Sequence, residues 1–171
     1  MIFMEIFNFS SIVDDKSEFV EGIMDFFNTD FLNNNFIKLE LEKFTEADAV
    51  KKWVPAYHFF ICDAHDNRMG KCCLRIGDNE NSYFGGHIGY EIDEPYRGHH
   101  YAAQACELLF SLAKKHEMSR VLITCNPDNI ASRKTCEYLK GNLLEIAKLP
   151  EDNDMRILKG ETEKCIFEFK L

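Results

Sequence analysis

The sequence predicts an α/β protein: one domain built on a mixed sheet of about seven strands, with helices on its faces. Consecutive strand patterns before residue 93 favour antiparallel pairing. The later alternation of strand and helix favours a parallel crossover. At 171 residues, the chain is long enough for one buried core and too short for two ordinary domains.

The first half of the chain carries the period-two pattern of strands. Residues 37–44, IKLELEKF, alternate apolar and polar side chains, and Thr45 then opens TEAD, whose capping-box spacing predicts a short helix. Residues 57–63 and 69–77 predict two strands joined at AHDN. After a loop at DNENS, residues 83–93 predict a strand whose glycines indicate a bulge or a close backbone approach.

The second half alternates helices and strands. Tyr101 to His116 forms an amphipathic helix, with Tyr101, Ala105 and Leu112 on its apolar stripe. The remaining predicted elements are a strand at 119–125, a helix at 130–139, a strand at 142–149, a loop at 150–162 and a final strand at 164–171.

Residues 1–35 are expected to form an N-terminal extension to a domain at 36–171. Within it, residues 16–27 place Phe19, Ile23 and Phe26 at helical spacing ahead of an Asn-rich breaker. We expect this helix to pack on the core. A surface for a partner, or for a second copy in a homodimer, is the alternative.

Charge and composition exclude several classes. A net charge of −9 argues against general nucleic-acid binding, and no apolar run approaches the roughly 20 residues that span a bilayer. The N-terminus lacks the basic flank and cleavage site of a signal peptide. Seven cysteines without a C-x-x-C pair are expected to be reduced, packed thiols in a cytoplasmic protein, with no metal site.

The stretch RGHHYAA lies between the predicted strand at 83–93 and the following helix. The first turn of a helix presents N–H groups without intrahelical partners, and its dipole favours an anion such as phosphate. Arg97 adds a charged donor, and Gly98, Ala102 and Ala103 leave room for a ligand near the main chain. The dinucleotide and P-loop glycine patterns are both absent.

Two longer stretches carry a family resemblance. YEIDEPYRGHHYAAQACELLFSLAK resembles the acyl-coenzyme A signature of the GNAT superfamily of N-acetyltransferases, with Arg97 first, Ala102 last and His100 where a glycine usually stands. TCNPDNIASRKTCEYLKG resembles the second cofactor element of that superfamily, matched by Asn129 and Ser132. LELEKFTEADA resembles its first strand and helix, so the likeness covers residues 36–171.

The resemblance implies that acetyl-CoA binds in a cleft where two parallel strands splay apart. The pantetheine arm would pair with the backbone of one strand, the diphosphate would sit on the loop, and Asn129 and Ser132 would hold the arm. The implied cofactor-binding residues are Tyr90, Glu91, Ile92, Arg97, Gly98, His99, His100, Tyr101, Ala102, Ala103, Asn129 and Ser132.

The implied reaction is direct attack of a primary amine, on a small molecule or a peptide, on the thioester in a ternary complex, without a metal. A non-catalytic acyl-CoA-binding or sensing module is the alternative, and a nucleotide-binding protein is a more distant one. Glu91 and His87 are the candidate general bases, with Tyr83 a further candidate, and each has a structural role as its alternative.

Two residues depart from the superfamily pattern. His100 either supplies only its N–H from a right-handed helical conformation, which we expect, or touches the cofactor with its imidazole. Cys136 lies seven residues after Asn129, where many members of the superfamily carry a tyrosine that protonates the departing sulfur. We expect it to be a small packed residue rather than the general acid.

Overall fold

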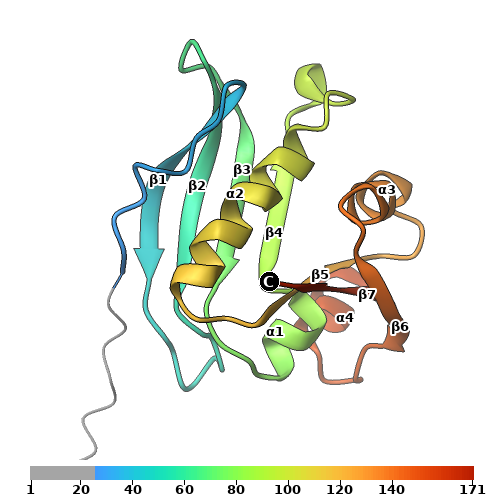
Figure 1. The fold of residues 1–171 in the computed structure, drawn as a ribbon. Coiled ribbons are helices and arrows are strands. Elements are labelled where there is room, and N and C mark those ends of the chain that lie inside the picture. Colours follow the sequence, from blue (N-terminus) through green and yellow to red (C-terminus); the bar gives the residue numbers. More distant parts are fainter. Residues whose placement is uncertain (1–25) are drawn as a thin grey trace, which may run out of the picture.

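The computed structural model describes residues 26–171, which fold around one seven-stranded sheet in the order β1-β2-β3-β4-β5-β7-β6 (Figure 1). The strands are β1 (Ile37–Thr45), β2 (Ala56–Asp63), β3 (Arg68–Arg75), β4 (Ile88–Ile92), β5 (Arg120–Cys125), β6 (Asn142–Lys148) and β7 (Glu163–Lys170). The helices are α1 (Glu80–Gly85), α2 (Tyr101–Lys115), α3 (Ile130–Tyr138), α4 (Asp154–Lys159) and the 3₁₀ turn η1 (Glu94–Tyr96). The predicted mixed sheet is confirmed.

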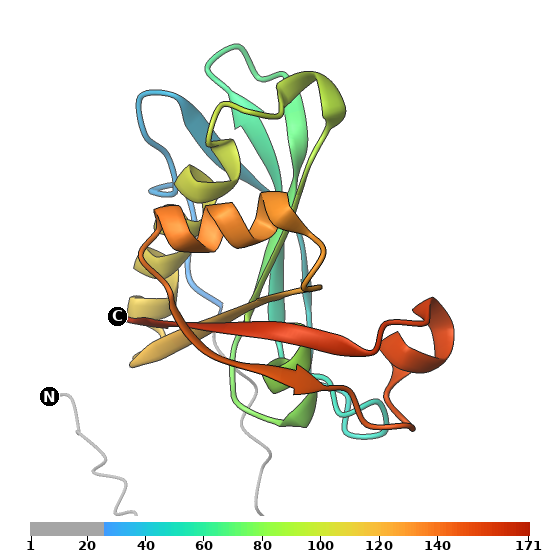
Figure 2. The ribbon, with the colours of Figure 1, turned by 90° about the vertical axis from the view of Figure 1, so that its right-hand side faces the viewer.

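The sheet contains one parallel junction, between β4 and β5. Strands β1 to β4 pair antiparallel in sequence order, and β5 and β6 each pair antiparallel with β7. The parallel junction holds a single aligned pair, Ile88 with Ile123. In Figure 2, β6 and β7 run across the view while β2 to β4 run up it, so the sheet changes direction at this junction.

Helices α2 and α3 cover one face of the sheet and α1 covers part of the other. The main core lies under α2, where Leu109 and Leu112 pack with Phe59, Ile88 and Ile123, all almost completely buried. A smaller cluster on the opposite face joins Leu122, Ala147 and Ile166 to Tyr83 and Phe84 of α1. Because side chains alternate along a strand, neighbouring residues of β5 serve different clusters.

The chain before β1 also contributes to the core. Leu32 is buried at 1% exposure, and its carbonyl accepts a hydrogen bond from the Leu39 N–H of β1 at 2.8 Å. The helix predicted at 16–27 lies outside the described residues except for Phe26 and Phe27, which are not helical.

The helix predicted to open at Thr45 is absent from this position. Thr45 is the last residue of β1 and pairs with Ala56 of β2. The Asp48 carboxylate accepts the Lys51 N–H at 3.0 Å, and a short bridge joins Asp48 to Trp53. The TEAD pattern was wrong as a helix signal because strand pairing holds its first residue, while Asp48 caps a tight turn instead.

Two predicted loops contain helices. DNENS contributes Asn79 as the N-cap of α1, and the Asn79 and Ser82 side chains accept each other's backbone N–H at 2.8 Å. The strand predicted at 83–93 is β4, which therefore begins at Ile88 rather than at residue 83. In the loop at 150–162, Asn153 caps α4 and Gly160 ends it with a left-handed φ of 69°. Both helices begin at Asn, a cap that also favours turns, which explains the error.

Candidate active site

The candidate site is the wedge that opens where β4 and β5 part. Beyond the Ile88–Ile123 pair, β4 continues to Ile92 while β5 continues to Cys125, with no further pairing between them. The loop at residues 97–100 follows β4 and η1, and α3 follows β5, so both helix N-termini lie at the open end of the wedge. This is the splayed-strand arrangement that the resemblance implied.

The loop before α2 offers a run of free donors. Among residues 26–171, no protein group accepts a hydrogen bond from the N–H groups of Gly98 to Ala103, and the first helical bond is Gln104 N–H to the His100 carbonyl at 3.1 Å. Residues 97–100 are exposed, and a side chain added at Gly98 would meet nothing within 4 Å. An anion can therefore approach this backbone, and the α2 dipole favours it there.

His100 adopts a different conformation from the one expected. It is the N-cap of α2 with a φ of 60° and a ψ of 17°, in the left-handed region, so the right-handed prediction was wrong. The chain must turn here in a way that suits glycine, and a non-glycine residue bears strain of about 1–2 kcal/mol. The imidazole also stacks on Tyr138 of α3, with ring centroids 4.5 Å apart, and so links the loop to α3.

Arg97 and Asn129 each combine a structural contact with a free donor. The Arg97 Nε donates to the Ile92 carbonyl at 2.9 Å, while within the described chain its terminal amino groups have no acceptor. The Asn129 Oδ1 caps α3 by accepting the Ser132 N–H at 3.0 Å. The amide nitrogen of Asn129 has no acceptor among the described residues and can serve a ligand.

Tyr90 closes the inner end of the wedge with its side chain. Its hydroxyl lies 2.8 Å from the Ser132 hydroxyl, so a hydrogen bond joins β4 directly to α3. Burial raises the pKa of the Tyr90 phenol well above its usual value, which keeps the hydroxyl protonated. The sequence placed only the backbone of Tyr90 at the site, and nothing in it pointed to this side chain.

His87 is fully buried, with 0% exposure, one residue before β4 begins. Its Nδ1 accepts the Leu122 N–H of β5 at 2.9 Å, which places the proton of the neutral ring on Nε2. Burial lowers the pKa of His87, although Asp78, with a carboxylate oxygen 3.4 Å from Nε2, acts in the opposite direction. The Nδ1 is therefore occupied, whereas the buried Nε2 has no hydrogen-bond partner among the described residues. Full burial and the bond to β5 suit a structural role.

The Glu91 side chain is exposed, and its carboxylate is available to a ligand. Tyr90 points towards α3, so the alternation along β4 turns Glu91 to the opposite face, the one that carries α1. Within residues 26–171, Glu91 takes part in no salt bridge or side-chain hydrogen bond. The third base candidate, Tyr83, lies on α1 and donates its hydroxyl to Glu145 of β6, which raises the pKa of Tyr83.

A buried polar cluster at the carboxyl end of β5 was not anticipated from the sequence. The Lys164 ammonium, only 9% exposed, contacts the Asn126 Oδ1 at 2.7 Å and the Glu161 carboxylate at 2.6 Å. Burial alone would raise the pKa of Glu161, but hydrogen bonds from Lys164 and Asn126 outweigh it and lower the pKa. Glu161 and Lys164 are three residues apart, but Asn126 lies 35 residues before Glu161, so no local pattern could reveal the whole cluster.

Cys136 lies inside the protein rather than in the open wedge. It is 0% exposed, and burial raises the pKa of its thiol to about 12. All seven cysteines are free thiols, and five of them, Cys72, Cys106, Cys125, Cys136 and Cys165, belong to the main core. Cys136 therefore packs as a small apolar residue, as expected.

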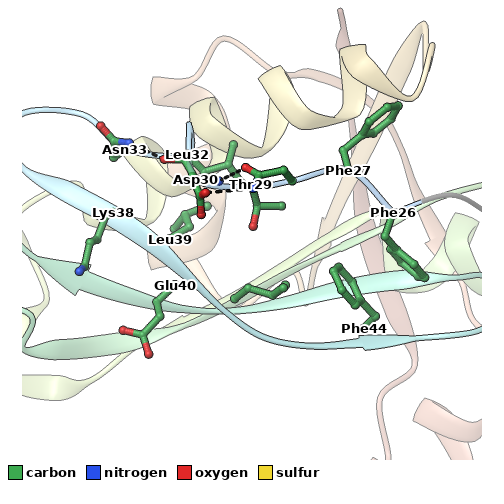
Figure 3. Close-up of a pocket in the computed structure, with 12 residues that line it drawn as sticks. Phe26, Phe27, Thr29, Asp30, Leu32, Asn33, Lys38, Leu39, Glu40 and Phe44 are labelled. Carbon is green, nitrogen blue, oxygen red and sulfur yellow. Dashed lines mark hydrogen bonds between the residues drawn. The ribbon is translucent and has the colours of Figure 1, made fainter.

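A separate groove of about 580 Å³ lies between residues 26–33 and β1 (Figure 3). The Phe26 and Phe44 rings stack at one end with centroids 4.2 Å apart, and Lys38 and Glu40 line the other end. Strands β2 and β3 separate β1 from β4, so the groove is remote from the wedge. The candidate site therefore rests on the free donors of the wedge, not on the volume of this groove.

No helix in residues 26–171 is long and apolar enough to cross a membrane. In the same residues, no three His, Cys, Asp or Glu side chains are grouped to hold a metal ion.

The wedge between parallel strands, with a donor-rich loop on one wall, defines the acetyltransferase class, and the sequence matches it. The family model for the acetyltransferase (GNAT) domain matches residues 21–141, most of the chain. The protein belongs to the GNAT family of acetyltransferases and is an acyltransferase. No curated protein matches the sequence.

Solved structures of this fold resemble the chain at low identity. They include RimL, a ribosomal L7/L12 alpha-N-protein acetyltransferase (21% identity, TM-score 0.52), where the match covers 67% of this chain and 69% of RimL. MccE, a microcin C7 self-immunity acetyltransferase in complex with acetyl-CoA and AMP, has 22% identity and a TM-score of 0.54, with 68% and 61% covered. The ribosomal-protein-S5-alanine acetyltransferase of Vibrio fischeri has 19% identity and a TM-score of 0.53, with 67% and 61% covered.

Proposed function

We propose that this protein transfers the acetyl group of acetyl-CoA to a primary amine of a small molecule or a peptide, by direct attack in a ternary complex. One observation carries the proposal: the consecutive unpaired N–H groups of Gly98 to Ala103 at the N-terminus of α2. They fit the diphosphate of the cofactor, and Arg97 adds a positive charge beside them. RimL, an alpha-N-protein acetyltransferase, and MccE, solved in complex with acetyl-CoA and AMP, support the same chemistry.

The pantetheine arm would lie along the free edge of β4. The backbone groups of Tyr90 to Ile92 that face β5 have no strand partner, because β4 and β5 pair only at Ile88. The Asn129 amide and the Ser132 hydroxyl stand on the opposite wall, at the start of α3. The arm would thus replace the missing strand contacts between β4 and β5.

Glu91 is our proposed general base. The attacking amine must lose a proton, and a carboxylate that is exposed and unpaired beside the wedge can accept it directly or through water. His87 suits this task less because its Nδ1 already accepts a backbone hydrogen bond and its ring is buried. The amine enters from the face that carries α1, towards which Glu91 points, while the cofactor enters from the side of α2 and α3.

The test has two stages, both on the full chain. Acetyl-CoA at about 100 times its dissociation constant should stabilise the fold by roughly 2.7 kcal/mol, and ATP should not. A panel of small amines and peptides is then assayed for release of CoA thiol. No thermal shift with millimolar acetyl-CoA would remove the cofactor assignment. A shift without thiol release from any amine would favour the non-catalytic sensing module.

A further inference from the structure

The Tyr90 hydroxyl lies with the Ser132 hydroxyl at the inner end of the wedge that the proposed reaction uses. It extends from β4 across the inner end of the wedge and meets Ser132 in the first turn of α3, at 2.8 Å. The strands part just before Tyr90, at the Ile88–Ile123 pair. A thioester held between β4 and β5 would therefore place its sulfur close to this pair of hydroxyl groups.

The surroundings of Tyr90 leave its proton available. Ser132 and Cys136 lie on one face of α3, four residues apart, and both are hydrogen-bonding neighbours of the Tyr90 hydroxyl. The titratable groups that face it are thiols: Cys106 from α2 and Cys136 from α3, with Cys125 of β5 beside Ser132. Burial raises the pKa of each thiol, so no ionised group beside Tyr90 competes for the proton.

We propose that Tyr90 is the general acid of the transfer reaction and donates its proton, directly or through the Ser132 hydroxyl, to the departing sulfur. This inference rests on the proposed function. Tyr90 gives up its proton as the bond between the acyl carbon and the sulfur breaks and the electron pair stays on sulfur. The phenolate then regains a proton from water, and the proton released by the amine leaves through Glu91.

Cys136 does not serve this role as well as Tyr90. Its thiol is completely buried and lies in the core cluster with Cys125 and Cys165. A cysteine at this position leaves space beside α3 that the Tyr90 ring, packed against the same cluster from β4, can enter. The general acid would therefore be a residue of β4 rather than a residue of α3.

Tyr90→Phe tests the proposal because it keeps the ring and removes only the hydroxyl. The matched control is Tyr96→Phe, another half-buried tyrosine, whose hydroxyl has no hydrogen-bond partner among the described residues. We expect Tyr90→Phe to lower turnover by about 100-fold, within the range of a lost general acid, while the acetyl-CoA dissociation constant changes less than about threefold. Tyr96→Phe should leave both unchanged.

A second readout does not depend on turnover. The pKa of the CoA thiol in the binary complex is titrated by the ultraviolet absorbance of the thiolate. If Tyr90 donates to the sulfur, Tyr90→Phe raises that pKa by about one to two units, equivalent to one lost hydrogen bond to a charged group. A merely structural role for Tyr90 predicts no such shift.

The outcomes separate this inference from the proposed function. If the wild type binds CoA and releases thiol with an amine, but Tyr90→Phe keeps both its turnover and its bound-thiol pKa, then Tyr90 is not the acid and the proposed function stands. If the wild type binds no CoA, the proposed function fails and this inference fails with it. A variant with low turnover but an unchanged thiol pKa would assign Tyr90 a packing role and overturn the inference.

Discussion

The two halves of the candidate site are built in different ways. The cofactor half, residues 97–103 and 129–132, consists of two short continuous segments that work mainly through backbone N–H groups and helix caps. The proposed acceptor half consists of side chains on the opposite face: Glu91, the Tyr83–Glu145 pair and the cluster of Asn126, Glu161 and Lys164. Local sequence thus determines the first half, whereas the second depends on segments far apart in the chain.

This difference predicts how each half tolerates change. A backbone N–H remains when the side chain of its residue is replaced. Substitutions in the cofactor half should therefore change cofactor binding mainly when they alter charge or backbone conformation. A side chain in the acceptor half acts through its own functional group, so its loss removes the function or leaves a buried partner unpaired.

The largest effect should come from Glu91→Gln. The amide keeps the size of the carboxylate but cannot take the amine proton, so we expect turnover to fall by about 100-fold or more at neutral pH. Acetyl-CoA affinity, measured by calorimetry, should stay within about threefold. Glu94→Gln, an exposed acid in η1, is the control and should behave as wild type. Equal activity in the two variants would show that the base lies elsewhere.

Lys164→Ala should destabilise the fold by about 3–5 kcal/mol, because it leaves the buried Glu161 carboxylate without its cation. Lys159→Ala, on the exposed side of α4, should change the unfolding free energy by less than about 0.5 kcal/mol. Both values are measured by chemical denaturation. A small effect at Lys164 would mean that water replaces the ammonium and that the cluster is not rigid.

The same cluster predicts an acid dependence of stability. The folded pKa of Glu161 lies below its ordinary value of 4.5, so its contribution is complete above that value and is lost as the pH falls through the folded pKa. Glu161→Gln should therefore lose less unfolding free energy than the wild type between about pH 6 and about pH 3. Identical acid profiles for the two proteins would contradict the assignment.

In the cofactor half, His100→Asp should weaken acetyl-CoA binding by about tenfold or more, because a carboxylate beside the diphosphate repels it. His100→Asn is the matched control: it has nearly the same size as Asp, also accepts the left-handed conformation at φ 60°, and carries no charge. We expect it to bind within about threefold of wild type. Equal losses in both variants would make the imidazole itself a cofactor ligand.

The smallest effect on turnover should come from Cys136→Ala. The Cys136 thiol is completely buried in the main core, so we expect that a departing sulfur in the wedge does not reach it. Turnover should therefore fall less than about tenfold. A drop of about 100-fold, with unchanged acetyl-CoA affinity and melting temperature, would make Cys136 the acid in place of Tyr90.

The sequence by itself determined the sheet, the long helix α2 and the location of the loop that precedes it. Alternating side chains identify β1, whose first residues present one face to the core, while β2 and β3 are short runs rich in apolar residues. The apolar stripe of α2 has the helical period. The short helices α1 and α4 were missed because, over six residues each, an Asn cap and a turn look the same.

Only the tertiary structure decided which side chains meet. His100 took a left-handed conformation because the chain must turn into α2, and its neighbour Tyr138 is 38 residues away in sequence. Two hydrogen bonds cross the junction of β4 and β5: the His87 Nδ1 accepts the Leu122 N–H, and the Tyr90 hydroxyl is bonded to the Ser132 hydroxyl. The physical reason is that backbone patterns repeat over a few residues, whereas the partner of a buried polar group is set by the fold that buries it.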